Sequence, residues 1–291
     1  MGLSVIASRR TETNLRLAEL ADSRFGGCFL TPREAMRRLH PGDFALARLD
    51  VRRTLDGVEP GLESLAELEC RGVLVLNSAR ALLTAHDKLL TAELFAATGI
   101  PHPTTVHLTG GELPPLAAPL VLKPRFGSWG RDVLLCSSPE AVRDALRRLR
   151  RRPWFRRHGV LAQELIPPVG RDVRVLVAGG RVVGAVQRVA AAGEWRTNVA
   201  LGAARRPVVP PREARRLALA AAVAIGGDLV GIDLLPQGRG GFIVLEVNGA
   251  VEFTEDYSLG RDVYAAVSAA LARLISTRGQ SVDTIASAAE G

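Results

Sequence analysis

The chain has 291 residues, of which 47% are hydrophobic and 23% are charged, and its net charge is +8 at pH 7. This composition excludes a disordered chain and predicts a globular protein of two or three lobes. The positive charge favours an anionic partner, such as a nucleotide, a nucleic acid or an acidic protein.

The sequence lacks the pattern of a membrane span or a secretion signal. Charged residues interrupt every apolar stretch well before the ~20 residues that a transmembrane helix needs, and Met1–Ala7 lacks a basic start and a long apolar run. The three cysteines, Cys28, Cys70 and Cys136, have no metal or disulfide spacing. We therefore expect a cytoplasmic protein with reduced thiols and no membrane partner.

Short apolar runs alternate with helical patterns through residues 1–85, which predicts an α/β domain with a mainly parallel sheet. Its strands are predicted at Leu3–Ala7, Cys28–Leu30, Phe44–Ala47 and Val73–Leu76. Its helices are predicted at Thr11–Ser23, Pro32–Leu39 and Gly61–Cys70, and Asn77 or Ser78 can cap a further helix.

The remainder of the chain is rich in strands. A helix over His86–Thr98 is predicted to end at Gly99, because Pro101 and Pro103 forbid its continuation. Strands are predicted at Leu120–Lys123, Asp132–Cys136, Val160–Glu164, Asp172–Ala178, Arg181–Arg188, Leu229–Leu235 and Phe242–Asn248. Helices are predicted at Pro139–Arg151, Pro211–Ile225 and Val263–Ile275. Residues 276–291 are small and polar, and we expect a flexible tail there.

The last two strands form a predicted hairpin that carries oxygen ligands. Pairing Leu235 with Phe242 would place Asp233 and Glu246 on one face at a diagonal of roughly 7–8 Å, with Asn248 on the same face. Two carboxylates and an amide oxygen are costly to bury without a cation, and Mg²⁺ prefers such ligands. The alternative is an exposed face on which the acids align by chance.

The loop from Lys123 to Val133 contains Gly127 and Gly130, whose backbone can approach phosphate oxygens closely. Lys88 and Lys123 are the only two lysines, which suggests sites that need a point charge. An ordinary hairpin turn explains the glycines equally well, because their spacing is not that of a P-loop.

Several arginines can bind anions. Arg174, Arg188 and Asn198 lie on or beyond strands, where arginine can clamp a phosphoryl group or a carboxylate; exposed positions on the sheet are the alternative. Arg143–Arg157 contains eight arginines and one acid, Asp144. This run indicates a solvated helix face or, as the alternative, a docking surface for an acidic partner.

The histidines show no ligand spacing, and no Ser- or Cys-based triad is supported.

Taken in order, these segments resemble the ATP-grasp ligases, in particular the branch of the RimK-type glutamate ligases and of LysX, the ligase of the carrier protein LysW. The matching segments span roughly residues 78–275 and are His86-Asp-Lys-Leu89, Val121-Leu-Lys-Pro124, Gly127-Ser-Trp-Gly-Arg131, Gln163-Glu164, Gly170-Arg-Asp-Val-Arg-Val175, Trp195-Arg-Thr-Asn198, Ala224-Ile-Gly-Gly-Asp228, Gly231-Ile-Asp233, Glu246-Val-Asn248 and Glu252-Phe253. The Gly-Ser-Trp-Gly-Arg segment and the Val-Glu-Phe after Glu-Val-Asn favour LysX over RimK.

The resemblance implies an α/β protein with the ATP-grasp fold. Residues 1–85 would form a pre-ATP-grasp α/β domain, residues 86–160 a central α+β lobe, and residues 161–275 a C-terminal α+β lobe with the metal site. The two lobes would enclose ATP.

The resemblance also assigns roles to residues. The ATP-binding residues would be Lys88, Lys123, Gly127, Ser128, Trp129, Gly130, Gln163, Glu164, Leu165, Ile166, Asp172 and Arg174. Two Mg²⁺ ions, with Mn²⁺ as an alternative, would be held by Asp233, Glu246 and Asn248, in agreement with the hairpin argument. The catalytic residues at the transferring phosphate and the acceptor carboxylate would be Arg188, Arg196 and Asn198.

The implied reaction is ATP-dependent amide formation between a carboxylate and an amine through an acylphosphate. The LysX-like interpretation joins an amino acid to the C-terminal glutamate of a small acidic carrier protein, and the alternative is a RimK-like glutamate ligase acting on a protein tail or a coenzyme. We expect a homo-oligomer, either a dimer or a tetramer. Val199–Ala204 and Gly249–Val251 depart from the family pattern, so the accepted amino acid stays open.

A protein of a different class, a basic nucleic-acid-binding protein, would also fit the charge. The chain has only two Tyr and three Trp, and these do not alternate with basic residues as in a stacking platform. We therefore expect no nucleic-acid partner.

Overall fold

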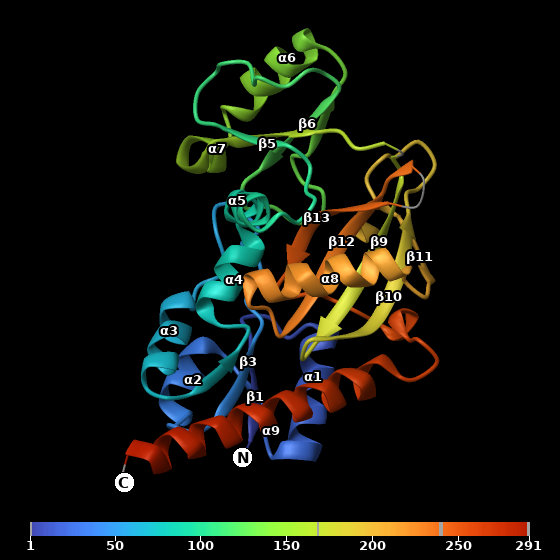
Figure 1. The fold of residues 1–291 in the computed structure, drawn as a ribbon. Helices are drawn as coiled ribbons and strands as arrows, with labels where there is room; N and C mark the ends of the chain where they lie inside the picture. Colours follow the sequence, from blue (N-terminus) through green and yellow to red (C-terminus); the bar gives the residue numbers. More distant parts are fainter. Residues whose placement is uncertain (1, 168, 239–240, 290–291) are drawn as a thin grey trace.

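The computed structural model describes residues 2–167, 169–238 and 241–289, and it describes side chains up to residue 280 (Figure 1). Its strands form three sheets, which follow one another from the N-terminal domain to the central and the C-terminal lobe. None of the helices in these ranges is both long enough and apolar enough to cross a membrane.

The N-terminal domain contains a parallel sheet in the order β2-β1-β3-β4, as the sequence predicts. Its strands are β1 (Leu3–Ile6), β2 (Phe29–Leu30), β3 (Phe44–Ala47) and β4 (Leu74–Leu76). Its helices are α1 (Glu12–Phe25), α2 (Pro32–Arg38), α3 (Leu62–Cys70) and α4 (Ala79–His86). Thr11, Thr31 and Ser78 each accept a backbone N–H at a helix start, which explains where α1, α2 and α4 begin.

The central lobe contains an antiparallel sheet in the order β5-β8-β6-β7. Its strands are β5 (Thr105–Leu108), β6 (Leu120–Pro124), β7 (Leu134–Cys136) and β8 (Val160–Glu164). The helix α5 (Lys88–Thr98), capped by Asp87, leads into this lobe, and α6 (Pro139–Leu149) and α7 (Pro153–His158) pack on its sheet. The strand β5 and the helix α7 were not predicted from the sequence, because segments of 4 and 6 residues are too short to show a clear period.

The C-terminal lobe contains an antiparallel sheet in the order β11-β10-β9-β12-β13. Its strands are β9 (Arg171–Ala178), β10 (Arg181–Val189), β11 (Ala204–Pro207), β12 (Leu229–Pro236) and β13 (Phe242–Asn248). The helix α8 (Arg212–Ile225) packs on the face that carries Val175 and Val177, and α9 (Val263–Ala289) packs on the face that carries Leu176. Because side chains alternate along a strand, the two helices cover opposite faces.

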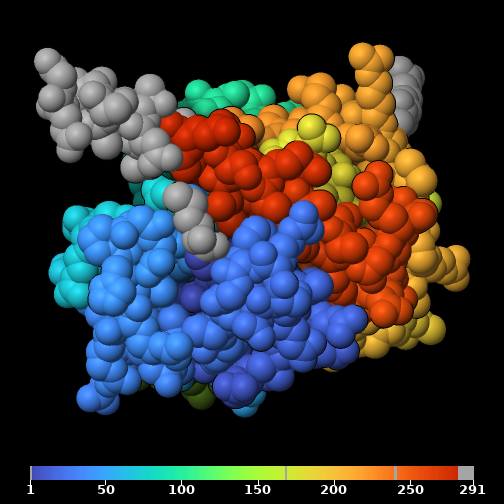
Figure 2. Space-filling view, turned by 90° about the horizontal axis from the view of Figure 1, so that it is seen from below, coloured from blue at the N-terminus to red at the C-terminus, as the bar shows by residue number. Residues whose placement is uncertain are grey.

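The helix α9 corrects the prediction of a flexible tail from residue 276. The helix was expected to end at Ile275, but it continues to Ala289. The segment contains no proline, and the Arg278 side chain donates to Asp228 Oδ1 at 2.7 Å, which stabilises the helix beyond Ile275. Figure 2 shows α9, in red, lying against the N-terminal domain, in blue.

A buried asparagine joins the N-terminal domain to the C-terminal lobe. Asn77 follows β4 in a left-handed conformation, with φ +54°. Its Oδ1 accepts from the backbone N–H groups of Asp228 and Leu229 at 2.8 and 3.0 Å. Its Nδ2 donates to the carbonyl oxygens of Leu229 and Gly249 at 2.8 and 3.1 Å. Because these bonds satisfy the whole side-chain amide, they fix the parallel sheet against the hairpin of β12 and β13.

Candidate active site

A cavity that is partly open to solvent lies between the central and the C-terminal lobe. Its walls come from β6, β8 and the loop after β6 on one side, and from β9, β10, β12 and β13 on the other. The predicted site residues that line it are Lys88, Lys123, Gly127, Ser128, Gly130, Gln163, Glu164, Leu165, Ile166, Asp172, Arg188, Arg196, Asn198, Asp233 and Glu246. Residues far apart in the sequence therefore meet at one site.

Three predicted site residues do not line the cavity. The Trp129 ring lies instead beside the guanidinium groups of Arg9 and Arg131, each 5.2 Å from its centroid. Arg174 is occupied by Asp233, to which it donates two hydrogen bonds, and the Asn248 amide donates to the carbonyl oxygen of the facing strand.

The two lysines lie at one end of the cavity. Lys88 Nζ donates to the Gly127 carbonyl oxygen at 2.6 Å and lies 3.3 Å from Glu246 Oε2. Lys123 Nζ donates to Gln163 Oε1 at 2.7 Å. Burial lowers the pKa of Lys123 to about 7, and the positive charge of Lys88 adds to this effect. A negatively charged ligand at this end would restore the full charge of Lys123.

The floor of the cavity is a network of buried charges. Arg188 donates to Asp172 Oδ1 at 2.8 Å and to Asp233 Oδ2 at 2.7 Å. Arg174 donates to both oxygens of Asp233 at 2.5 and 2.7 Å. Thr197 donates to Asp172 Oδ2 at 2.5 Å. Thr197 lies in the motif Trp195-Arg-Thr-Asn198, but no role was predicted for it from the sequence.

The two aspartates of this floor have opposite pKa shifts. Burial raises the pKa of Asp172, against the opposing effect of Arg188. Burial would also raise the pKa of Asp233, but the guanidinium groups of Arg174 and Arg188 hold it well below its usual range. Asp233 is therefore ionised at neutral pH.

The hairpin of β12 and β13 brings the predicted metal ligands together in a register that differs from the prediction. Asp233 lies directly opposite Glu246, rather than diagonally, and Gly231 lies opposite Asn248. A bulge follows Asp233, and Leu235 therefore pairs with Ile243 rather than with Phe242. The donors suit Mg²⁺, which one or two carboxylates hold when phosphate oxygens complete its shell. Glu246 is the accessible donor, because its side chain is 20% exposed and that of Asp233 is 1% exposed.

Apolar side chains also line the cavity. They belong to Val121, Leu165, Ile166 and Leu245, and of these only Leu165 and Ile166 were singled out from the sequence. The Gln163 side chain accepts from Lys123 and donates to Thr105 Oγ1 at 2.9 Å. The apolar residues suit a flat apolar group such as a nucleotide base, with the backbone after β8 at its edge.

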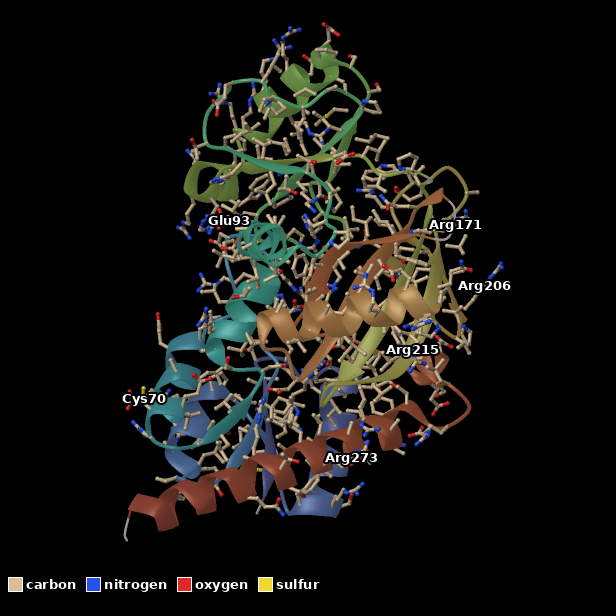
Figure 3. All side chains as sticks on the ribbon, viewed as in Figure 1. Cys70, Glu93, Arg171, Arg206, Arg215 and Arg273 are labelled. Carbon is tan, nitrogen blue, oxygen red and sulfur yellow. The ribbon has the colours of Figure 1, made fainter. Side chains whose placement is uncertain are left out.

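Arginines also line the mouth of the cavity. Arg196 donates to the Gly130 carbonyl oxygen at 2.9 Å and to Glu194, which fixes its guanidinium beside the loop. Arg171 and Arg206 lie on the outer side of the C-terminal lobe, and Arg171 contributes to the cavity wall (Figure 3). The mouth therefore favours anionic ligands.

Comparison with protein families matches residues 85–271 to the RimK-like ATP-grasp domain. A protein of Parasynechococcus marenigrum named probable alpha-L-glutamate ligase is 30% identical over 265 residues. These residues cover 82% of this chain but 54% of that protein. A protein of the same name from Haemophilus influenzae is 32% identical over 216 residues, which cover 71% of this chain and 70% of the relative. The chain thus spans about half the length of the first relative and more than two thirds of the second.

Solved structures support the fold at lower identity. The D-alanine–D-alanine ligase of Bacillus anthracis in complex with ATP is 18% identical, with a TM-score of 0.68 and 97% of both chains covered. A RimK domain ATP-grasp protein of Sphaerobacter thermophilus is 22% identical, with a TM-score of 0.67 and coverage of 92% of this chain and 98% of that one.

Proposed function

The chain belongs to the RimK-like ATP-grasp family, and on this premise we propose that it is an ATP-dependent ligase that joins a carboxylate to an amine. The observation that carries the proposal is the cavity in which Lys88 and Lys123 face the carboxylates of β12 and β13. The cationic, apolar and acidic side chains that line this cavity match the parts of a nucleotide triphosphate and its metal.

The proposed reaction has two steps. A carboxylate oxygen of the substrate attacks the γ-phosphorus of ATP, the bond to the β-phosphate oxygen breaks, and ADP leaves. The amine then attacks the acyl carbon, phosphate leaves with the bonding electrons, and the amine loses a proton. A protein nucleophile is not required, because the acylphosphate provides a good leaving group.

In this mechanism the residues of the chain position and neutralise charge. Lys88 and Lys123 would bind phosphate oxygens. Arg196 donates a hydrogen bond to the Gly130 carbonyl oxygen, so its guanidinium lies beside the loop after β6. Arg188 is held by Asp172 and Asp233, so its guanidinium is fixed before substrate binds.

We further propose Mg²⁺ as the cofactor, with Glu246 as the ligand that faces the cavity and Asp233 and Asn248 as further ligands. Asp233 and Asn248 would exchange hydrogen bonds that they make within the protein for the metal. The resemblance implies two ions, with Mn²⁺ as an alternative. When bound, Mg²⁺ would neutralise the triphosphate and stabilise the charge that develops during phosphoryl transfer. Glu246 would exchange its contact with Lys88 for the metal, since its carboxylate faces the cavity.

The names of the relatives favour glutamate as the amine substrate. The methanogen relative is named tetrahydromethanopterin:alpha-L-glutamate ligase, so a coenzyme acceptor is one alternative. The LysX-like motifs favour an acceptor glutamate at the C-terminus of a small acidic carrier protein. We favour the carrier, because the net charge of +8 would attract an acidic protein to this chain.

The test measures ADP release with ATP, Mg²⁺, glutamate and a synthetic acidic peptide that ends in glutamate. ADP should form only when both the amine and the acceptor are present. Glu246→Gln should reduce turnover at least a hundredfold, because it removes a metal-binding charge at constant volume. Glu140→Gln, an exposed glutamate on α6, is the matched control and should leave turnover unchanged. Near-normal turnover of Glu246→Gln would refute the metal assignment.

A further inference from the structure

The loop between β6 and β7 contains two residues other than glycine in the left-handed conformation. Trp129, Gly130 and Asp132 have φ angles of +58°, +68° and +52°. Only glycine adopts this left-handed conformation without steric cost, so Trp129 and Asp132 must be held by contacts outside their own backbone. We call residues 126–133 the lid.

The distal end of the lid is held within its own lobe. The Trp154 indole N–H and the Arg152 guanidinium both donate to the carboxylate of Asp132, at 2.9 and 3.0 Å. These contacts stabilise the left-handed conformation of Asp132, but none of them involves Trp129.

Trp129 is held by the N-terminal domain. The Arg9 guanidinium lies 5.2 Å from the centroid of the Trp129 ring. Arg9 is itself fixed, because it donates to the Val51 carbonyl oxygen at 3.0 Å and forms ion pairs with Glu59 and Asp50. A cation over the face of an indole ring is attracted by its quadrupole, and tryptophan is the strongest aromatic partner.

Arg131 lies at the same distance from this ring, 5.2 Å, and donates to the Arg53 carbonyl oxygen at 3.5 Å. The contact with the ring lies within the lid, because Arg131 is itself a lid residue, and the hydrogen bond to Arg53 is a second link between the lid and the N-terminal domain. The repulsion between Arg9 and Arg131 is reduced by Glu59 and Asp50, which pair with Arg9.

These contacts orient the rest of the lid toward the cavity. Trp129 is turned away from the cavity, while Gly127, Ser128 and Gly130 line it. The Ser128 hydroxyl is buried without a hydrogen-bond partner among the described residues. A Cβ atom at Gly130 would lie 2.7 Å from Asn198 Oδ1, so the lid backbone and the C-terminal lobe are already in close contact.

We propose that Arg9 is a positioning residue, which holds the lid over the nucleotide site through the Trp129 ring. The N-terminal domain thus sets the order of the lid, although it contributes no residue to the cavity wall. The consequence for ATP rests on the proposed function, whereas the consequence for lid order does not.

The experiment compares Arg9→Met with Arg16→Met. Both substitutions remove a guanidinium and keep an unbranched apolar side chain. Arg16 is a matched control, because it also lies over an aromatic ring, that of Tyr264 at 5.9 Å, but on α1 and outside the lid. Amide hydrogen exchange of residues 126–133 is measured by mass spectrometry without nucleotide, and the Michaelis constant for ATP is measured separately.

Arg9→Met should increase lid exchange about two- to thirtyfold, which corresponds to about 0.5–2 kcal/mol of cation–π attraction. The Michaelis constant for ATP should rise over the same range, and kcat at saturating ATP should change less. Arg16→Met should change neither. Arg9→Lys keeps the charge and should restore most of the protection.

A double-mutant cycle with Trp129→Leu separates the stack from other effects of Arg9. Trp129→Leu should increase lid exchange at least as much as Arg9→Met, because it also removes the contact with Arg131. The double variant should be no faster than Trp129→Leu, because the contact between Arg9 and Trp129 is already lost in that variant. Wild-type lid exchange in Arg9→Met, or additive effects in the double variant, would overturn the proposal. A different outcome is faster lid exchange in Arg9→Met while neither the wild type nor any variant binds ATP. This outcome would overturn the proposed function, but the proposed contact between Arg9 and the lid would still hold.

Discussion

The arginines on the floor of the cavity are paired and shielded from water, whereas those on the surface of α6 and α7 are exposed. On the floor, the side chains of Arg174 and Arg188 are 14% and 4% exposed, and both donate to Asp233, whereas Arg188 alone of the two also donates to Asp172. On the α6–α7 surface, which we define as the arginines within Arg143–Arg157, all the guanidinium-bearing residues are exposed. The ion pairs within α6, such as Arg147 with Asp144, lie in solvent.

Burial and pairing, rather than the number of charges, therefore decide what an arginine contributes to stability. A buried charge depends on its partner, because water cannot replace the lost interaction. An exposed ion pair contributes about 0–1 kcal/mol, because water and salt screen it. The two regions should therefore respond very differently to the loss of one acid.

The largest effect is expected for Asp233→Asn. The substitution keeps the volume but removes the negative charge that Arg174 and Arg188 share. We expect the free energy of unfolding to fall by about 3–5 kcal/mol, measured by urea denaturation. Asp144→Asn, which breaks the exposed pair on α6, is the control and should cost at most about 1 kcal/mol. Equal losses in the two variants would contradict the comparison.

A second prediction concerns Lys123, the buried cation without a carboxylate partner within hydrogen-bonding distance among the described residues. Its pKa is about 7 in the folded chain and 10.5 ordinarily, so between these values the unfolded chain binds more protons than the folded chain. The free energy of unfolding therefore gains a contribution that rises with pH from about 7 to 10.5, by at most about 1.4 kcal/mol per pH unit.

The measurement compares wild type with Lys123→Met by urea denaturation at pH 7.5 and pH 9. The wild type should gain about 2 kcal/mol relative to the variant across this interval. A constant difference between the two proteins would mean that Lys123 keeps its ordinary pKa.

The parts of the fold that the sequence predicted are those with strong local patterns. The parallel strands of the N-terminal domain are short apolar runs, and helices α1, α2 and α4 carry side-chain caps that can be read directly. The segment β11 has the sequence Ala204-Arg-Arg-Pro207, which has no apolar period, and its pairing with β10 provides the strand. Tertiary context therefore decided this element.

The candidate site, too, was predicted from the sequence only in part. Lys88, Lys123 and the hairpin acids were singled out because their residue types are unusual in their surroundings. The register of the hairpin was wrong, because the bulge after Asp233 leaves no signal in the composition of the turn. The positions of Trp129 and Arg174 could not be predicted either, since each is set by a partner from a distant segment, Arg9 and Asp233 respectively.

The smallest effect on stability is expected on the α6–α7 surface. Arg147, Arg148 and Arg151 are exposed, and Arg148 and Arg151 have no ion pair among the described residues. Changing all three to Glu should alter the free energy of unfolding by no more than about 0.5 kcal/mol per substitution. If the acidic carrier binds here, the same variant should raise the Michaelis constant for the acidic peptide and weaken its salt dependence, since charges of opposite sign steer the encounter.

The matched control for this variant reverses three arginines elsewhere. Arg212, Arg215 and Arg273 are exposed on α8 and α9. Figure 3 shows Arg215 and Arg273 away from α6 and α7. Both triple variants change the net charge by the same amount, so a general effect of charge would appear in both. A rise in the Michaelis constant for the peptide in the α6–α7 variant alone would locate the docking surface there. Equal responses would show that the overall field of the protein attracts the peptide, whereas unchanged kinetics in both would leave these arginines as a solvated helix face.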